Sequence, residues 1–447
     1  MDKSEFKSRR EELMEIMGKG SIAILPAAPT QIRSHDVHYP YRQDSNFYYL
    51  TGFPEPHALA VIIPQREQGQ YIIFCRENDP EQETWQGSRA GLEGACEIYG
   101  ADDAFPITDI NDIVPGLMES CCRLYYPMGY YPEFDDQIMG WMNQLRRRAR
   151  SGVVSPCEMV ALDHILHEMR LFKSEAEEQA MRTAADITIR AHKRAMRFCR
   201  PGLYEYELEA EIKHEFMRSG CRYPAFPTIV ASGKNACTLH YTENNSVLKD
   251  GDLVLIDAGV EFDYYASDIT RTFPVNGHFT PAQKTIYELV LKAQRVALNQ
   301  ISPGKPWNEP YEAAAEVTTQ ELMKLGLLVG KYEALIEEEA YKRFYVPRIG
   351  HWLGMDVHEP GNYKIDGLWR ELEPGIVMTV EPGIYIPASE DIPEEWWNIA
   401  IRIEDNVLIT ENGHEVLTAA LPKTVAGIEA FMAGENNKFG TPTSSEC

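Results

Sequence analysis

Hydrophobic positions in the first 170 residues favour a mixed α/β domain. A helical spacing of apolar residues predicts a helix at about 4–18. Apolar runs bounded by turn residues predict strands at SIAILPAAP (21–29), NFYYLTGF (46–53), HALAVIIP (57–64) and YIIFCR (71–76). Two further helical stretches are predicted at about 81–98 and 134–150, so we expect an N-terminal α/β domain over residues 1–172.

The pattern changes at Ser174, where a capping box with Glu177 predicts the start of a long helix that runs to about 199. A Pro-Gly pair ends this helix and a second helix follows it. Strands are then predicted at FPTIVAS (226–232) and DLVLIDAG (252–259).

The same order of elements recurs about a hundred residues later. A helix predicted at 280–301 is ended by Ser-Pro-Gly, another helix runs to about 325, and strands return at 376–386 and 399–410. This order predicts an internally duplicated α+β domain over residues 173–434, with a sheet built from both halves.

Composition limits the kinds of partner and compartment. The net charge of −25 on 447 residues would repel a phosphate backbone, so we expect no nucleic-acid partner. No apolar run approaches the roughly 18 residues that a membrane span requires, and the N-terminus lacks the apolar core of a signal peptide. Nine cysteines without a CxxC pair suggest neither a disulfide framework nor a zinc ribbon, so we expect a reducing cytoplasm. The polar tail at 435–447 is predicted to be disordered.

Four carboxylates lie in or beside core-type strands. Asp257 follows the wholly apolar run LVLI (253–256), Asp268 comes eleven residues later, and Glu381 and Glu404 lie in or beside the two later strands. Each one alone could cap a turn or pair with an arginine. Together they are too costly to bury unless cations neutralise them. Two divalent ions would balance four carboxylates, and His351 supplies a candidate nitrogen ligand.

Several motifs, in this order, carry a resemblance to a known family: IDAG (256–259), SDITRTF (267–273), GHWLGMDVHE (350–359), TVEPGIYI (379–386) and IRIEDN (401–406). The chain resembles the pita-bread metallopeptidases and, within them, the Xaa-Pro aminopeptidase (aminopeptidase P) family. The resemblance extends to YPYRQDSNFYYLTGF, HEMRLFKS and LHYTEN in the rest of the chain. It implies an α+β protein, in which an N-terminal α/β creatinase/prolidase-like domain precedes a C-terminal pita-bread catalytic domain.

The resemblance implies five ligands for two divalent metal ions: Asp257, Asp268, His351, Glu381 and Glu404. Asp268 and Glu404 would bridge both ions, His351 and Glu381 would complete one, and Asp257 the other. Mn²⁺ is the expected metal, although this donor set also suits Co, Fe or Zn. A hydroxide activated between the two ions would then attack the scissile carbonyl.

The resemblance also implies roles around the substrate. His240 and His358 would line the pocket and steady the peptide carbonyl or the tetrahedral intermediate, although His358 alone could also be a satisfied core histidine. Glu381 is expected to shuttle a proton. The remaining implied positions are Tyr385 and Arg402 beside the ligands, Trp85 reaching a neighbouring subunit's active site, and Pro347, where the family usually has a substrate-facing histidine.

The function implied is hydrolysis of the N-terminal residue from peptides with proline in second position. A prolidase, which accepts only Xaa-Pro dipeptides, shares the catalytic fold and stays open as an alternative. A pita-bread binding module with weakened catalysis is the non-enzymatic alternative, although such modules tend to lose ligands and all five are present here. The resemblance suggests a homo-oligomer, a dimer or a tetramer formed through the N-terminal domain.

Overall fold

The computed structural model describes residues 1–345 and 348–434, and the chain divides into two compact units between Arg170 and Leu171. The domain boundaries expected from the sequence, 1–172 and 173–434, stay predictions. Pro347 and the predicted disordered tail lie outside the described residues.

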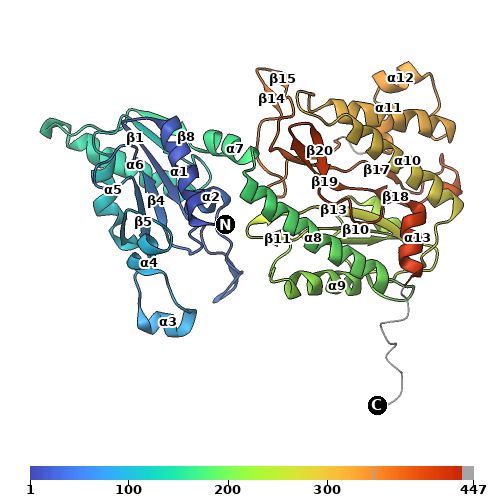
Figure 1. Cartoon of the computed structure of the whole chain (residues 1–447), viewed down its shortest axis with the longest axis horizontal. Coiled ribbons are helices and arrows are strands. Elements are labelled where there is room, and N and C mark those ends of the chain that lie inside the picture. Colours follow the sequence, from blue (N-terminus) through green and yellow to red (C-terminus); the bar gives the residue numbers. More distant parts are fainter. Residues whose placement is uncertain (346–347, 435–447) are drawn as a thin grey trace, which may run out of the picture. The chain divides into compact units, whose positions relative to one another are not determined.

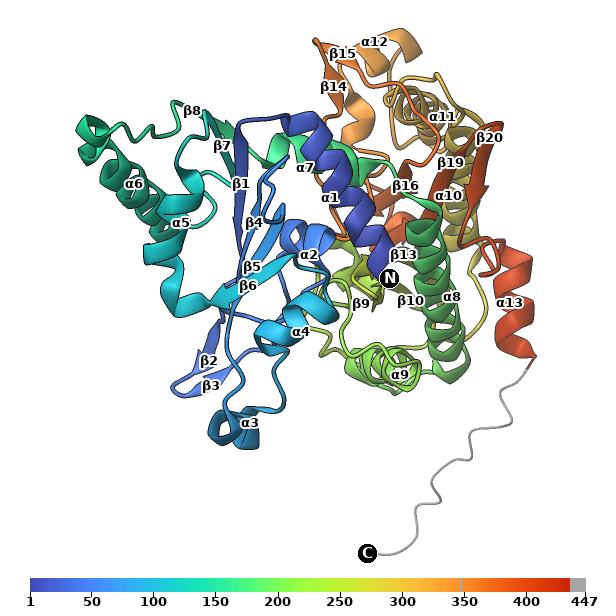
Figure 2. The ribbon, with the colours of Figure 1, turned by 60° about the vertical axis from the view of Figure 1, so that its left-hand side comes forward.

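The N-terminal unit is a six-stranded mixed sheet flanked by helices. In chain order its elements are α1 (Lys3–Met17), β1 (Ser21–Pro26), β2 (Ile32–Ser34), β3 (Val37–His38), α2 (Ser45–Thr51), β4 (Leu59–Ile62), β5 (Tyr71–Cys75), α3 (Pro80–Gln86), α4 (Gly91–Glu97), β6 (Asp103–Pro106), α5 (Ile110–Met118), β7 (Arg123–Tyr126), α6 (Pro132–Arg147), β8 (Glu158–Ala161) and α7 (Asp163–Leu171). The strand order is β6-β5-β4-β1-β7-β8. Helices α5 and α6 cover one face of this sheet, and α1 and α2 lie on the other (Figures 1 and 2).

Two predictions for this unit are wrong. The stretch NFYYLTGF, predicted as a strand, belongs to helix α2 because Asp44 caps its start by accepting a hydrogen bond from the Phe47 amide (2.9 Å) and Gly52 ends it at φ 64°. The helix predicted at 81–98 is two helices, α3 and α4. Gly87 ends α3 and Gly91 begins α4, both at positive φ, and a side chain at Gly91 would collide with Asn78.

The C-terminal unit holds the predicted chemistry. Its elements are α8 (Glu175–Phe198), α9 (Glu205–Arg218), β9 (Ile229–Ser232), the 3₁₀ helix η3 (Gly233–Cys237), β10 (Leu253–Ala258), β11 (Glu261–Phe262), β12 (Tyr265–Ala266), β13 (Ile269–Pro274), α10 (Pro281–Asn299), α11 (Glu309–Lys324), α12 (Tyr332–Glu337), β14 (Lys364–Ile365), β15 (Leu368–Trp369), β16 (Val377–Val380), β17 (Gly383–Ile386), β18 (Ile399–Arg402), β19 (Asp405–Thr410), β20 (Gly413–Val416) and α13 (Val425–Ala433). No helix in the described part of the chain is long and apolar enough to span a membrane.

The prediction of a single sheet built from both halves is wrong for the described residues: the strands of the two halves lie in separate sheets that contact one another. In the first half β10 pairs with β9 and β13; in the second, β19 pairs with β16 and β20, and β17 pairs with β18. The Glu404 amide donates to the Thr270 carbonyl (3.1 Å), and this bond joins the halves. Helix α8 packs against the strands of the first half and α10 against those of the second (Figure 1).

The capping box predicted at the start of α8 is confirmed. The Glu177 amide donates to Ser174 Oγ (3.4 Å), and Glu177 Oε2 accepts from the Ser174 amide (3.0 Å). Glu177 Oε1 also accepts from the Tyr265 hydroxyl of β12 (2.8 Å). The cap therefore fixes the helix end and ties it to the strands that lead to Asp268.

Candidate metal centre

The candidate ligands lie at the ends of adjacent strands. Asp257 is the fifth residue of β10, and Asp268 immediately precedes β13, the antiparallel neighbour of β10. Glu381 directly follows β16, and Glu404 lies between β18 and β19. The segment that carries His351 runs beside β16, since the His351 carbonyl accepts from the Thr379 amide (2.9 Å).

Asp268, His351 and Glu404 form the tightest group, with candidate ligand atoms all within 4.8 Å of one another. His351 Nε2 lies 3.3 Å from Asp268 Oδ2 and 3.5 Å from Glu381 Oε1. The other ring nitrogen, Nδ1, lies 2.9 Å from the Trp352 carbonyl and donates to it. That hydrogen bond leaves the Nε2 lone pair facing the carboxylates, the tautomer in which a histidine binds a metal.

Threonine hydroxyls orient two of the carboxylates. Thr379 Oγ1 donates to Glu381 Oε1 (3.1 Å), and the same oxygen accepts from the His351 amide (3.0 Å). Thr270 Oγ1 donates to Glu404 Oε2 (2.6 Å). Each hydroxyl satisfies one carboxylate oxygen and leaves the other available to a cation.

Arg402 is the buried cation beside this group. Its Nη2 donates to Asp257 Oδ2 (2.6 Å), its Nη1 to the Tyr385 hydroxyl (2.7 Å) and its Nε to Thr270 Oγ1 (3.0 Å). The guanidinium therefore neutralises Asp257, and through Thr270 it also helps to orient Glu404.

The electrostatics of the group fit the binding of cations. Burial, followed by repulsion from the neighbouring carboxylates, raises the pKa values of Asp268 and Glu404 well above those of ordinary acids. Asp257 Oδ1 and Asp268 Oδ1 are buried without a hydrogen-bond partner among the described residues. Four carboxylates and one imidazole suit hard or borderline divalent ions, which would satisfy both oxygens and relieve the repulsion.

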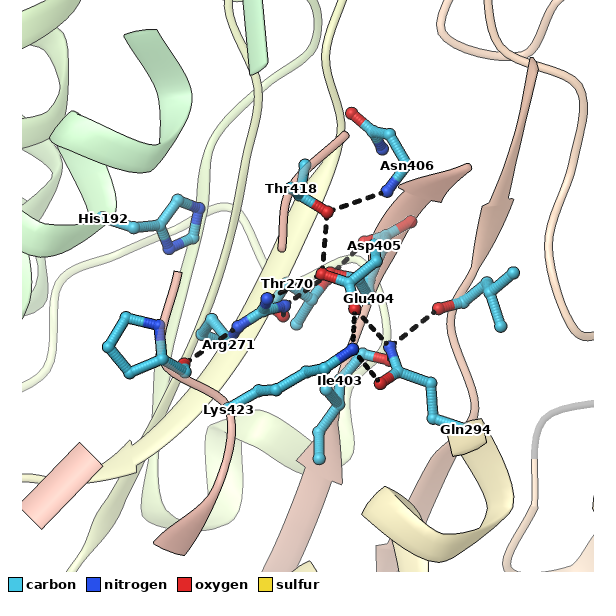
Figure 3. Close-up of polar contacts among 12 residues, drawn as sticks. His192, Thr270, Arg271, Gln294, Ile403, Glu404, Asp405, Asn406, Thr418 and Lys423 are labelled. Carbon is cyan, nitrogen blue, oxygen red and sulfur yellow. Dashed lines mark hydrogen bonds and ion pairs between the residues drawn. The ribbon is translucent and has the colours of Figure 1, made fainter. Parts of the chain in front are cut away.

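A second polar network lies behind Glu404 (Figure 3). Asp405 is completely buried and accepts from Arg271 Nη2 (2.7 Å), Thr418 Oγ1 (2.7 Å) and Lys423 Nζ (2.5 Å). Burial alone would raise the pKa of Asp405, but Arg271 and Lys423 lower it well below the ordinary aspartate value. Asp405 is therefore an ionised member of a neutralised network, unlike Glu404 beside it.

This network contacts the backbone of the ligand strands. Gln294 Nε2, from α10, donates to the carbonyls of Val380 (3.3 Å) and Ile403 (3.1 Å), which directly precede Glu381 and Glu404. Arg271 Nη1 donates to the Glu404 carbonyl (2.5 Å). A single buried amide therefore links two strands that each carry a candidate ligand.

Asn406 fixes the other end of the group. Its Oδ1 accepts from the Asp268 amide (3.1 Å) and from Ser267 Oγ (3.0 Å), and its Nδ2 donates to the Asp268 carbonyl. Glu404 and Asn406 are two residues apart on one extended segment. This segment thus supplies one candidate ligand and holds the backbone of another.

The carboxylates open into a cavity of about 350 Å³, whose lining includes all five candidate ligands together with His240, His358 and Arg402. The His358 ring meets that of His351 edge to face, with centroids 4.4 Å apart. Burial is the largest cause of a lowered pKa of His358. His358 is therefore a neutral imidazole at the cavity wall near neutral pH.

Two predicted positions are not in the lining. Tyr385 is buried and contacts Arg402. Trp85, on α3 of the N-terminal unit, is 82 % exposed. Pro347 lies outside the described residues.

Sequence reasoning missed the apolar wall of the cavity and the residues that orient the ligands. The wall includes Phe226, Pro227, Ile229, Leu239 and Val357. Thr270 was visible in the motif SDITRTF, where alternation along a strand could have placed it beside Glu404. Gln294 carried no signal of its own, because one glutamine on the buried side of a helix does not reveal which backbone it contacts.

Comparisons with known proteins agree with this geometry. The model of metallopeptidase family M24 matches residues 179–411, and that of the aminopeptidase P N-terminal domain matches residues 6–125. The chain belongs to metallopeptidase family M24. Its M24 region contains all the candidate ligands, and the fold is the expected one, an α/β N-terminal domain followed by the metallopeptidase domain.

Individual M24 relatives match over nearly the whole chain. The Xaa-Pro aminopeptidases of Escherichia coli and Haemophilus influenzae are 45% and 44% identical, each over 97% of this chain and 98% of the relative. The structure of Pseudomonas aeruginosa aminopeptidase PepP has a TM-score of 0.96 and 58% identity, covering 97% of this chain and 98% of that one. A zinc-substituted E. coli aminopeptidase P in complex with product has a TM-score of 0.94, 45% identity and the same coverage.

Proposed function

We propose that this chain is a metal-dependent Xaa-Pro aminopeptidase that removes the N-terminal residue from peptides with proline in second position. One observation carries the proposal: in a member of family M24, five candidate ligands and two histidines line a single cavity. The relatives of similar length that carry the name Xaa-Pro aminopeptidase support the choice of substrate.

Asp257, Asp268, His351, Glu381 and Glu404 would hold two divalent ions, with Mn²⁺ as the proposed native metal. When bound, such ions supply an activated water nucleophile and polarise the scissile carbonyl. By resemblance to the family, Asp268 and Glu404 are the proposed bridging ligands, and the closeness of their ligand atoms to each other and to those of His351, within 4.8 Å, supports this choice.

The protein's own residues would bind the peptide and move the proton. His240 and neutral His358, both in the cavity lining, would donate hydrogen bonds to the peptide carbonyl. Glu381, whose Oε1 is held by Thr379, would pass a proton to the departing proline nitrogen. Arg402 and Tyr385 would keep Asp257 and Glu404 oriented during this exchange.

The proposal is tested by assaying chelator-treated protein with an Xaa-Pro tripeptide, before and after addition of Mn²⁺. We expect no turnover without metal and recovery with it, because the nucleophile requires the ions. A tripeptide with alanine in second position is the control and should be cleaved poorly. Full activity after exhaustive chelation would contradict the proposal.

Peptide length separates the aminopeptidase from a prolidase. We expect Xaa-Pro tripeptides and pentapeptides to be cleaved at least as well as Xaa-Pro dipeptides. The basis is the WQGSRAG stretch (85–91), which by resemblance to the family borders an open cleft. A strict preference for dipeptides would assign the chain to the prolidases instead.

The protein is proposed to be a cytoplasmic homo-oligomer, a dimer or a tetramer, in which exposed Trp85 reaches a neighbouring subunit's active site.

Pro347 is proposed to lower kcat without affecting metal loading, because proline cannot donate the hydrogen bond of the histidine usual there. A Pro347→His variant with unchanged kcat/KM and intact metal content would contradict that role.

A further inference from the structure

Glu205 is a completely buried carboxylate in the C-terminal unit, outside the metal centre. It is the first residue of helix α9. Its Oε1 accepts from the Ser232 amide (2.7 Å), Ser232 Oγ (2.7 Å) and Asn235 Nδ2 (3.1 Å). Its Oε2 accepts from the Tyr241 hydroxyl (2.9 Å) and the Ser246 amide (2.9 Å).

All five donors are neutral, and within residues 1–345 and 348–434 no lysine or arginine forms an ion pair with this carboxylate. A buried charge is unfavourable unless donors saturate it. Five donors and the N-terminus of α9 together stabilise the negative charge of Glu205. Because each donor requires a fixed direction, the carboxylate also fixes the chain that supplies the donors.

The donors come from one segment, residues 232–246, and they lie at its start, its middle and its end. Between these anchors are Leu239, His240 and Thr242, all of which line the cavity beside the candidate metal ligands. His240 itself is exposed and directly precedes Tyr241. Its position therefore depends on the anchors and not on its own burial.

Backbone contacts strengthen the same arrangement. The Glu205 amide donates to the Ser246 carbonyl (3.0 Å). The main chain and the side chain of Glu205 therefore bind both backbone polar groups of Ser246, its carbonyl and its amide. The Tyr241 ring packs against the small apolar cluster that includes Ala231, Leu255 and Tyr385. Tyr385 in turn contacts Arg402, so the segment is seated against the support of the metal centre.

We propose that Glu205 is a positioning residue that holds the cavity wall formed by residues 239–242, and His240 in particular, in place for the peptide substrate. The role in substrate binding rests on the proposed peptidase function. It assigns a task to a buried carboxylate that contacts neither the candidate ligands nor the cavity.

The test compares Glu205→Gln and Glu205→Ala with Glu215→Gln. Glu215 is the matched control because it lies on the same helix, is 8 % exposed and accepts from Arg190 (3.2 Å), away from residues 232–246. Glutamine keeps an acceptor for Ser232 and Asn235 but presents an NH₂ group to the Ser246 amide. We therefore expect kcat/KM for an Xaa-Pro tripeptide to fall ~10-fold in Glu205→Gln and ~10²-fold in Glu205→Ala, and to stay within about twofold in the control.

Two readouts separate positioning from a general loss of structure. Hydrogen exchange of the amides at 238–246 should quicken by at least ~10-fold in Glu205→Ala, while the amides of β10 and the bound Mn²⁺ content stay unchanged. In a His240→Ala background, Glu205→Ala should lower kcat/KM by no more than about twofold, because its effect passes through His240. Equal losses in both backgrounds, or faster exchange throughout β10, would overturn the proposal.

If Glu205→Ala does not fold, Tyr241→Phe provides the second measurement. It removes one of the five donors and should give a smaller change in the same two readouts, and no change in either would overturn the proposal. Hydrogen exchange at 238–246 does not depend on substrate. If wild-type protein cleaves no Xaa-Pro peptide, the peptidase function fails, while faster local exchange in the variants would still support the role of Glu205 in holding residues 239–242 in place.

Discussion

Arg402 decides which of the buried carboxylates are already neutralised. It forms an ion pair with Asp257 (2.6 Å), whereas no lysine or arginine in the described part of the chain forms an ion pair with Asp268 or Glu404. Burial, followed by repulsion from the neighbouring carboxylates, raises the pKa values of these two acids, and Arg402 only partly opposes the rise. The two residues proposed to bridge the metal ions are therefore among the buried carboxylates that no lysine or arginine of the described residues neutralises through an ion pair.

We expect Asp268→Asn and Glu404→Gln to lose both ions, with metal affinity reduced more than ~100-fold, since each carboxylate would serve two ions at once. His358→Gln is the matched control in the same cavity. It should retain the metal and lose ~10²-fold in kcat, because it removes only a substrate contact. Titration calorimetry with Mn²⁺ measures the affinities. Two tightly bound ions in either carboxylate variant would contradict the ligand assignment.

Asp405 directly follows Glu404 in the chain, but its charge, unlike that of Glu404, is paired with Arg271 and Lys423. Asp405→Asn leaves the buried Arg271 and the partly exposed Lys423 without their shared counter-ion, and we expect the free energy of unfolding to fall by about 3–5 kcal/mol. The comparison is Glu415→Gln, which breaks an exposed pair with Arg182 and should cost less than about 1 kcal/mol. Urea unfolding of the metal-free proteins measures both. Equal losses in the two variants would show that burial does not strengthen the Asp405 pairs.

At the scale of helices and strands, sequence predicted best where a local signal marks the end of an element. The capping box at Ser174 and the apolar run that leads to Asp257 each gave the correct element. NFYYLTGF was misread because its aromatic residues favour strands, while Asp44 and Gly52, which define a helix, lie at or beyond its ends. Tertiary burial of Phe47 and Leu50 on one side then favours the helix.

The residues of the candidate site also fall into two groups, those that a local sequence signal identifies and those that it does not. The candidate ligands could be selected from the sequence because each is a carboxylate or histidine beside a core strand, within motifs that resemble a family. Gln294 and Glu205 could not, because their partners lie in other elements: Gln294 contacts residues about 90 and 110 positions away. Their roles are visible only once the strands and helices are assembled.

Gln294 offers a test of how far α10 supports the metal centre. In Gln294→Leu the carbonyls of Val380 and Ile403 lose a shared donor, so we expect metal affinity to fall ~10-fold or more as the two ligand strands shift. Arg295→Leu, at an exposed position on the same helix, should leave the affinity unchanged. Mn²⁺ affinity from calorimetry is the measurement, and equal affinities in the two variants would count against support from α10.

At the scale of the whole molecule, repulsion among the carboxylates of the metal centre destabilises the folded state when no cations are bound. The chain carries a net charge of −25, and several of its carboxylates are gathered at one buried cavity. Repulsion there is a cost that the folded state has and the extended unfolded chain lacks. Ions that bind only the folded state offset this cost and add their own binding free energy.

The metal-free protein should therefore lose stability as the pH rises. Folding raises the pKa values of Asp268 and Glu404 above their ordinary values of 3.8 and 4.5, so the folded state holds protons that the unfolded state has released. Stability from these two groups is complete at pH values below their ordinary pKa and is lost as the pH rises through the folded-state values. Asp405 acts in the opposite direction, because its lowered pKa makes its contribution disappear only in acid.

Urea unfolding from about pH 5 to about pH 8, with a chelator or with saturating Mn²⁺, measures this dependence. We expect a decline with pH in chelator that is much shallower in Mn²⁺, because bound cations stabilise the ionised carboxylates. Asp268→Asn is the control. In chelator its stability should decline less steeply with pH, because one of the two titrating groups is removed. Mn²⁺ should not stabilise this variant, because it lacks one of the candidate ligands. A metal-free wild type as stable at about pH 8 as at about pH 5 would mean that Asp268 and Glu404 are neutralised within the protein, and the centre would then have no electrostatic need for divalent ions.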